Sequence, residues 1–352
     1  MRFAVAAPCY VDFYKEAIEL EQLGFDGLWL FDSPMVHSDV YAALALIAVN
    51  TERIRIAPGV AVARNRAAPV TAHSIATINQ LAPGRVALGF STGNTARRAM
   101  GMAPVGLREF REEAITIRTL LRGESASYRE GGRESIVRLV HQHHGFIRLE
   151  PPIPLIMGAT APKSMRIAGE VGDGLITAGS DPETLKSWVG IATASRPVER
   201  SRTPFEVAAM VGVYVTAPGE SAASPGPREA LGPWVLAHLR LRLDTFKGPA
   251  DAMDPVLADF AREVARLPEP RHLWLYENYQ IGIGENFRRF VTAEAIHATC
   301  LCGPPDFIAD GIGKVFLAGA DEVILRPHAN GRTLDNYRRF VETVMRPMRG
   351  KS

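Results

Sequence analysis

The chain alternates between short apolar segments of β type and amphipathic segments of helical period, and this alternation is its most constraining feature. Eight apolar segments are each followed by a helical one, the order that an all-parallel sheet requires. Eight strands are also the number that closes a (β/α)8 barrel. The predicted strands are Phe3–Ala7, Gly27–Phe31, Ile54–Val62, Val86–Phe90, Pro154–Met157, Gly174–Thr177, Phe205–Val215 and Glu322–Leu325.

We expect residues 1–352 to form one α/β domain, a (β/α)8 TIM barrel with two insertions. Residues 125–150 carry Gly131-Gly132 between β-rich runs and predict a hairpin. Residues 216–300 predict a helical cap over the barrel mouth. A doubly wound open sheet is the alternative, but the turn after the first strand, Ala6–Tyr10, lacks the Gly-x-Gly-x-x-Gly pattern of dinucleotide binders.

Composition excludes several classes of protein. The chain is 47% apolar and 22% charged with a formal net charge of +2, as in an average globular enzyme. Its basic residues alternate with acidic ones, so we expect no nucleic-acid partner. Cys9, Cys300 and Cys302 are too few for a disulfide framework, which predicts a cytoplasmic protein. No apolar stretch reaches the roughly 18–20 residues of a membrane span, so no membrane partner is expected.

In a β/α barrel, ligands and catalytic groups lie at the carboxyl ends of the strands. The second predicted strand ends in Asp32-Ser33-Pro34, so a carboxylate directly follows an apolar run. This carboxylate can accept hydrogen bonds from a heteroaromatic ring, or it can cap the following turn. The first strand leads into Cys9 and Tyr10, which we expect to line the same pocket.

The third predicted strand contains Pro58-Gly59. Proline provides no N–H for the sheet and glycine has no side chain, so the pair predicts a bulge. The bulge either shapes the barrel or lets a flat ligand touch the main chain.

Two loops of small and hydroxyl-bearing residues follow the fourth and fifth predicted strands, at Ser91-Thr92-Gly93-Asn94 and at Gly158-Ala159-Thr160. The backbone N–H groups and hydroxyls of such loops can cradle a phosphate. Each loop alone is also typical of an ordinary β/α turn. Two of them after neighbouring strands are a more specific signal of a phosphate-bearing ligand.

The histidines do not indicate a metal site. His141, His143 and His144 lie in the hairpin insertion without a carboxylate cluster, which favours a solvated hairpin. Arg326 and His328 follow the last predicted strand. At the barrel rim either side chain can meet an anionic substrate, or it can have a purely local role in the loop.

Together these strings resemble the bacterial luciferase-like family of flavin- and deazaflavin-dependent oxidoreductases, and within it the methylenetetrahydromethanopterin reductase branch. The similarity covers about residues 1–195 and resumes at 303–326. The matching stretches are Leu23–Asp32, Tyr41–Ala48, Thr51–Ile54, Ala57–Val60 running to Arg66 and Pro69, Gly84–Gly89, Ile153–Ala159 and Ala168–Gly174.

The resemblance implies a barrel that binds a flavin-type cofactor in its mouth, with coenzyme F420 preferred over flavin mononucleotide (FMN). Asp32 would contact the polar edge of the ring, and Gly59-Val60 would be a non-prolyl cis peptide that supports one ring face. It also implies a homodimer or a higher homo-oligomer. The residues that would hold the ribityl and phosphate chain are Ser91, Thr92, Gly93, Asn94, Gly158, Ala159 and Thr160.

The expected reaction is F420-dependent hydride transfer to or from a small organic substrate. Deazaflavin reductases of this family commonly carry His after the Asp of the second strand, where this chain has Ser33. The proton donor therefore stays open, as does a second interpretation: a two-component monooxygenase that receives reduced FMN from a separate flavin reductase. A third is a catalytically silent cofactor-binding member. The candidate catalytic residues are Asp32, Ser33, Cys9 and His328.

Overall fold

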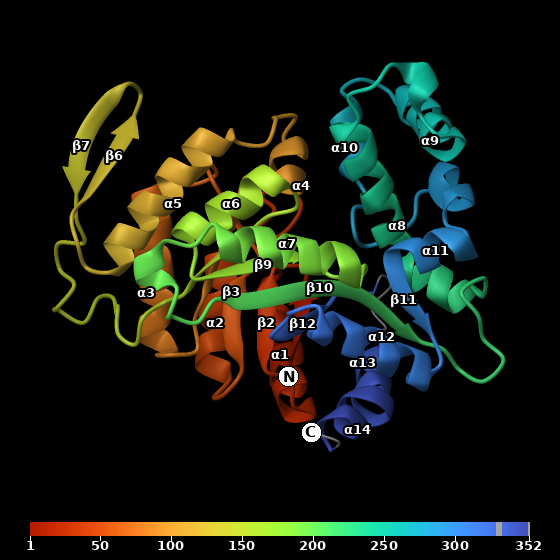
Figure 1. Cartoon of the computed structure of the whole chain (residues 1–352), viewed down its shortest axis with the longest axis horizontal. Helices are drawn as coiled ribbons and strands as arrows, with labels where there is room; N and C mark the ends of the chain where they lie inside the picture. The colour runs from red at the N-terminus through yellow and green to blue at the C-terminus, as the bar shows by residue number, and fades with distance from the viewer. Residues whose placement is uncertain (329–332, 351–352) are drawn as a thin grey trace. The chain divides into compact units, whose positions relative to one another are not determined.

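The computed structural model describes residues 1–328 and 333–350 (Figure 1). The chain divides into two compact units, one of Met1–Met210 with Val315–Ile324 and one of Val211–Lys314 with Leu325–Ser352. No helix of the described ranges is long and apolar enough to cross a membrane. The assignment of the whole chain to one domain stays a prediction.

The first unit is built on a parallel sheet whose two ends meet. β3 and β4 are two pieces of one strand, and Ile56 of β3 forms a parallel bridge with Val86, just before β5. The architecture is therefore the predicted TIM barrel, with eight strands when β3 and β4 are counted together. The sheet order is β3 (Arg55–Pro58), β2 (Gly27–Leu30), β1 (Arg2–Ala7), β12 (Glu322–Leu325), β10 (Glu206–Val215), β9 (Gly174–Ala178), β8 (Leu155–Gly158), β5 (Leu88–Ser91) and β4 (Ala61–Val62).

These strands form because they are short, almost wholly apolar runs. Every residue of β2 and β12 is buried, as expected for parallel strands whose two faces are both covered. The helices between them begin and end at recognisable signals: the carboxylate of Asp39 caps α2, and Gly24 ends α1 at a φ of 92°. The helices assigned to the first unit are η1 (Val11–Phe13), α1 (Tyr14–Leu23), α2 (Val40–Asn50), α3 (Ala68–Leu81), α4 (Asn94–Arg98), α5 (Leu107–Leu121), α6 (Pro162–Val171), α7 (Pro182–Ala194) and η2 (Val198–Arg200).

The first insertion is a hairpin, as predicted. β6 (Ala126–Glu130) and β7 (Arg133–Val137) pair antiparallel around Gly131 and Gly132, whose φ values are 56° and 78°. Positive φ at both central residues is the geometry that favours glycine in tight hairpin turns. Figure 1 shows the hairpin beside α5, and the Thr116 hydroxyl of that helix donates to the carbonyl oxygen of Ser127 at 3.0 Å.

The second unit is mostly helical, as predicted for residues 216–300, but it contains a strand that the sequence analysis missed. β11 (Cys300–Gly303) pairs in parallel with the second half of β10, Gly212 opposite Cys300. A four-residue apolar run directly after a helix has too few residues for its period to be read. The remaining helices are α8 (Pro225–Thr245), η3 (Ala250–Ala252), α9 (Pro255–Ala265), α10 (Arg271–Tyr276), η4 (Glu285–Phe290), α11 (Ala293–Thr299), α12 (Pro305–Leu317), α13 (Thr333–Phe340), η5 (Val341–Met345) and α14 (Arg346–Arg349).

A buried carboxylate lies at the amino ends of the barrel strands. Glu322 is 0% exposed and accepts a hydrogen bond from the indole N–H of Trp29 at 2.9 Å. Its other oxygen lies 3.9 Å from Nε of Arg2. Burial raises the pKa of Glu322 to about 7, because removal from water disfavours the charged form more than Arg55 and Arg2 favour it.

Candidate active site

Two carboxylates share one arginine at the carboxyl end of β2. Nη1 of Arg66 lies 2.7 Å from Oδ2 of Asp32, and Nη2 lies 2.7 Å from Oδ2 of Asp39. The same guanidinium stands over the ring of Tyr41, with Cζ 5.0 Å from the ring centroid. Asp32 is 3% exposed, so this arginine neutralises a carboxylate that water does not solvate.

The two carboxylates differ in proton affinity because they differ in burial. Burial raises the pKa of Asp32, although Arg66 opposes the shift. Asp39 is partly desolvated, but the hydrogen bonds from Arg66 and from the start of α2 outweigh that effect and lower its pKa. The arrangement therefore joins one exposed, readily ionised carboxylate to one buried carboxylate that is easier to protonate.

Cys9 and Ser33 lie beside this cluster. The Cys9 thiol is 1% exposed and donates to the backbone carbonyl of Asp39, with a sulfur–oxygen distance of 3.6 Å. Burial, and then the charge of Asp32, raise the pKa of Cys9 to about 12, so the thiol keeps its proton at neutral pH. Ser33 is buried, and its carbonyl oxygen accepts the N–H groups of Val36 and His37 in the turn that follows β2.

The interruption between β3 and β4 lies against Trp29. The Gly59-Val60 peptide bond is cis, as the family resemblance implies. A Cβ on Gly59 would stand 2.7 Å from Cβ of Trp29, so only glycine fits there. The Val60 side chain faces two more glycines: Cγ1 would be 2.9 Å from a Cβ on Gly89 and 3.5 Å from one on Gly158.

The loops after β5 and β8 meet. β5 pairs with β8 in parallel, and the Ser91 hydroxyl donates to the carbonyl oxygen of Gly158 at 3.0 Å. A Cβ on Gly158 would stand 2.9 Å from Cβ of Ser91, so the missing side chain is what allows the approach. The structure thus brings Val60, Ser91 and Gly158 together from three strand ends.

The other predicted loop residues differ in how many of their polar groups are already used. The Thr92 carbonyl accepts the N–H of Val105 at 2.9 Å, and Asn94 Oδ1 accepts Nε of Arg98 at 2.7 Å. Gly93 has a φ of 78° and leads into α4. In the loop after β8, the N–H of Ala159 donates to the carbonyl oxygen of Ile176 at 3.2 Å, and Thr160 is exposed.

Four further side chains near these strand ends carry buried polar atoms without a hydrogen-bond partner in the described structure. They are His37 at both ring nitrogens, Tyr41 at its hydroxyl, Asn65 at both amide atoms and Thr177 at its hydroxyl. Buried polar atoms are normally paired, so such a group indicates a place where a ligand or water completes the bonding. The sequence analysis missed all four and also the role of Arg66, although Asn65 and Arg66 lie three and four residues after the end of the third predicted strand.

His328 is placed differently. It is 6% exposed, with Nε2 2.6 Å from the carbonyl of Val213 and Nδ1 2.8 Å from Nδ2 of Asn336. Burial lowers its pKa to about 4. Both ring nitrogens are therefore bonded within the second unit, and the ring would have to give up a partner to reach a substrate.

The loops at the strand ends of the first unit hold a buried carboxylate and buried amide atoms without a hydrogen-bond partner. Contact distances require glycine at positions 89 and 158, because a Cβ there would press on Val60 and, at position 158, on Ser91. Asp32 offers a carboxylate, and Asn65 offers an unsatisfied donor and acceptor. Among the described residues, no group of three or more His, Cys, Asp or Glu is arranged to hold a metal ion.

A parallel β/α barrel with a ligand site at the carboxyl ends of its strands defines a class of enzyme. The chain belongs to the luciferase-like monooxygenase family, whose model matches residues 10–322. It is 32% identical over 197 residues to 5,10-methylenetetrahydromethanopterin reductase of Methanolobus tindarius, across 54% of this chain and 57% of the relative. It is 30% identical over 227 residues to F420-dependent glucose-6-phosphate dehydrogenase of Beutenbergia cavernae, across 58% of this chain and 64% of the relative.

The chain thus spans less than two thirds of the length of each of these two curated relatives. Among solved structures, an F420-dependent secondary alcohol dehydrogenase in complex with an F420-acetone adduct superposes with a TM-score of 0.70 at 19% identity. The superposition covers 99% of this chain and 98% of that one, and it shows the shared fold.

Proposed function

We propose that this protein is an oxidoreductase that binds coenzyme F420 and transfers a hydride to or from a small organic substrate. The observation that carries the proposal is the meeting of Val60, Ser91 and Gly158 at strand ends of the first unit, in which β2 leads into the buried Asp32. The two curated relatives, a reductase and an F420-dependent dehydrogenase, support the same chemistry.

The first unit offers a group for each part of such a cofactor. Val60 would support one ring face, and Asp32 would accept a hydrogen bond from the polar ring edge while Arg66 balances its charge. When bound, the deazaflavin supplies the hydride donor or acceptor. The residues that would hold its ribityl and phosphate chain are Ser91, Thr92, Gly93, Asn94, Gly158, Ala159 and Thr160.

Hydride transfer to a carbonyl or alkene needs a proton from another group, and Ser33 cannot supply it alone. The Cys9 thiol holds its proton with a pKa of about 12, and the ring of His328 is bonded at both nitrogens. We assign the proton exchange to His37, four residues after Ser33, whose two ring nitrogens lack a protein partner. His37 stacks on Phe31 with centroids 6.3 Å apart, and burial lowers its pKa to about 4, so its imidazole is neutral at pH 7 and can accept the proton that an alcohol releases on oxidation. In the direction of reduction, the ring takes a proton from water before passing it to the substrate.

A second candidate is a two-component monooxygenase that uses reduced FMN from a separate flavin reductase. Ser33 in place of the histidine favours it, and so does the description of the family model. A third is a silent cofactor-binding member of the family. For any of them we propose a cytoplasmic homodimer or higher homo-oligomer, in keeping with three free, buried cysteines.

The test is a parallel titration of the purified protein with F420 and with FMN, each oxidised and reduced, followed by cofactor fluorescence or absorbance. We expect selective F420 binding that weakens at least about tenfold in Thr92→Ala, since a hydrogen bond to a charged group contributes about 1.5–3 kcal/mol. Selective binding of reduced FMN would establish the monooxygenase instead. Binding of F420 without turnover over a broad panel of carbonyl and alcohol substrates would establish the silent member.

His37 is tested in the protein that binds cofactor. We expect His37→Gln to keep cofactor affinity and lower kcat, while Ser33→Ala lowers kcat less. Equal kcat values for His37→Gln and the unmodified protein would assign the proton exchange to another group.

A further inference from the structure

An arginine without a counter-ion lies directly after strand β12. Cζ of Arg326 stands 4.8 Å from the ring centroid of Trp234, on α8. The backbone holds both residues in place: the N–H of Arg326 donates to Val211 at 2.9 Å, and the Trp234 indole donates to the carbonyl of Pro327 at 2.8 Å. The guanidinium therefore has a fixed position on an aromatic face.

Within residues 1–328 and 333–350, the side chain of Arg326 makes no ion pair or hydrogen bond, and its Nε is buried without a partner. The four residues between those ranges are Ala, Asn, Gly and Arg, none of which carries a carboxylate. Arg326 is half-buried. Removing part of a cation from water is costly unless an anion or acceptor compensates it, and stacking on an indole contributes only about 1–2 kcal/mol.

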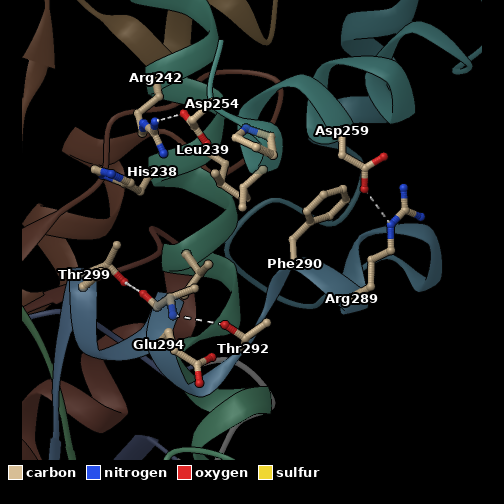
Figure 2. Close-up of a pocket in the computed structure, with 15 residues that line it drawn as sticks. His238, Leu239, Arg242, Asp254, Asp259, Arg289, Phe290, Thr292, Glu294 and Thr299 are labelled. Carbon is tan, nitrogen blue, oxygen red and sulfur yellow. Dashed lines mark hydrogen bonds and ion pairs between the residues drawn. The ribbon is translucent and has the colours of Figure 1, made fainter.

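Arg326 differs in this respect from other arginines of the second unit. Figure 2 shows a pocket between α8, α9, η4 and α11 in which Arg242 pairs with Asp254 and Arg289 pairs with Asp259. The charges in that pocket are balanced by protein carboxylates. Burial lowers the pKa of His238, and the charges of Arg242 and Arg326 lower it further, so both arginines lie near this residue. Arg242 has a carboxylate partner, whereas Arg326 has none among the described residues.

The surroundings of Arg326 suit a small anion. Its electrostatic neighbours are the Cys300 thiol and Tyr279, neither of which is a carboxylate, and burial raises the pKa of Cys300. A second half-buried arginine, Arg240, stands over the Tyr279 ring with Cζ 5.3 Å from its centroid, and its Nε is also buried without a hydrogen-bond partner. Burial lowers the pKa of both guanidinium groups, which is the effect that a bound anion would reverse.

We propose that Arg326 is an anion-binding residue of the second unit, which takes a carboxylate or phosphate group. A guanidinium presents paired N–H donors that match both groups. The anion site does not rest on the proposed function.

The anion site is tested on the full chain with inorganic phosphate and with acetate, at constant ionic strength set by sodium chloride. Calorimetric titration and the shift of Tm with anion concentration report the affinity. We expect a dissociation constant on the order of millimolar for the unmodified protein, a loss of about tenfold or more in Arg326→Met, and partial retention in Arg326→Lys. Arg242→Met is the matched control, and we expect its anion affinity to stay within about twofold, because the charge it removes is already balanced by Asp254.

Equal anion affinity in Arg326→Met and the unmodified protein, with the circular dichroism spectrum of Arg326→Met unchanged, would overturn the site. Should Arg326→Met not fold, the same comparison is made with Arg326→Gln, which also removes the charge. An unaltered affinity of Arg326→Gln for both anions would equally overturn the site.

The source of the anion is tested with F420 and with its deazariboflavin core, which lacks the phosphate and the glutamate tail. We expect Arg326→Met to bind both like the unmodified protein, because the site takes a free anion and not the cofactor. Weaker binding of F420 but not of the deazariboflavin would assign the site to the cofactor phosphate and overturn a separate anion site. Anion binding that depends on Arg326 in a protein that binds no F420 would refute the proposed function and leave the anion site standing.

Discussion

Nη1 of Arg66 lies 2.7 Å from Oδ2 of Asp32, and Asp32 is almost completely removed from water. The ion pair therefore allows the Asp32 carboxylate to carry its charge although it is buried. The environment that a cofactor ring would meet at the end of β2 is set by two residues together and not by the aspartate alone.

Arg66→Met is expected to lower the free energy of unfolding by about 3 kcal/mol at pH 7, because it leaves Asp32 buried as an unpaired charge. Without Arg66 the pKa of Asp32 rises further, so the loss shrinks as the pH is lowered and the carboxyl becomes protonated. Urea unfolding at pH 7 and pH 5 measures the difference. Arg108→Met, which removes an exposed pair with Glu112, is the control and should cost about 0–1 kcal/mol. An equal loss of unfolding free energy at pH 7 and pH 5 in Arg66→Met would show that the unpaired charge of Asp32 is not its cause.

Gly93→Ala is expected to destabilise the protein by about 1–3 kcal/mol and to weaken cofactor binding. The φ of 78° disfavours any side chain, and the new Cβ would collide with Val62 and stand 2.9 Å from Cγ of Arg97. Gly190→Ala is the matched control, because its Cβ meets nothing within 4 Å and it lies inside α7. That substitution should raise stability by about 0.5–1 kcal/mol and leave cofactor affinity unchanged. Similar cofactor affinities in the two variants would remove the loop after β5 from the proposed site.

Glu322→Gln is expected to change how stability depends on pH. The folded-state pKa of Glu322 is about 7 and its ordinary value is 4.5, so between these values the folded state holds a proton that the unfolded state has lost. This group therefore reduces the stability of the unmodified protein as the pH rises from about 4.5 to 7. The variant lacks that decrease. Relative to the unmodified protein, its free energy of unfolding should therefore rise between pH 5 and pH 8 by a few kcal/mol at most.

The measurement for Glu322→Gln is urea unfolding at pH 5 and pH 8, with Glu112→Gln as an exposed control. The free energies of the control should follow those of the unmodified protein at both pH values. A stability gain in Glu322→Gln that is the same at pH 5 and pH 8 would show that packing, and not ionisation, is responsible.

The three cysteines are expected to react slowly in the native protein. All are free and buried, and burial raises the pKa of Cys9 and of Cys302 to about 12. Thiol reagents attack the thiolate, which is scarce at pH 8 for such groups. Titration with a chromogenic disulfide reagent should find almost no rapid reaction in buffer and three thiols in urea. Rapid modification of one thiol in the native state would identify a more accessible cysteine than the structure describes.

The sequence was sufficient for the barrel because its strands are apolar on both faces. Runs such as Gly27–Leu30 can be recognised from four or five letters when helices follow regularly, and the hairpin at Gly131-Gly132 has its own turn signal. The sequence analysis missed β11 because Cys300–Gly303 follows α11 without an intervening loop. Four residues are also too few for a strand period to be recognised.

The candidate site was predictable in outline only. The two loops after β5 and β8 could be placed side by side because neighbouring parallel strands end at the same edge. The pairing of Asp32 with Arg66 spans 34 residues and depends on where two loops turn, which no periodicity reports. The unsatisfied atoms of His37 and Asn65 are visible only when every neighbour is in place.

The contact between Ser91 and Gly158 restricts how the two loops can diverge in evolution. Any side chain at position 158 would occupy the space in which the Ser91 side chain lies, so it requires a smaller residue at position 91 or a shift of β5 against β8. Among homologous sequences the two positions should therefore vary in a correlated way. Their residue types would then form a signature of the loop geometry that a reader can recognise in a new sequence without its structure.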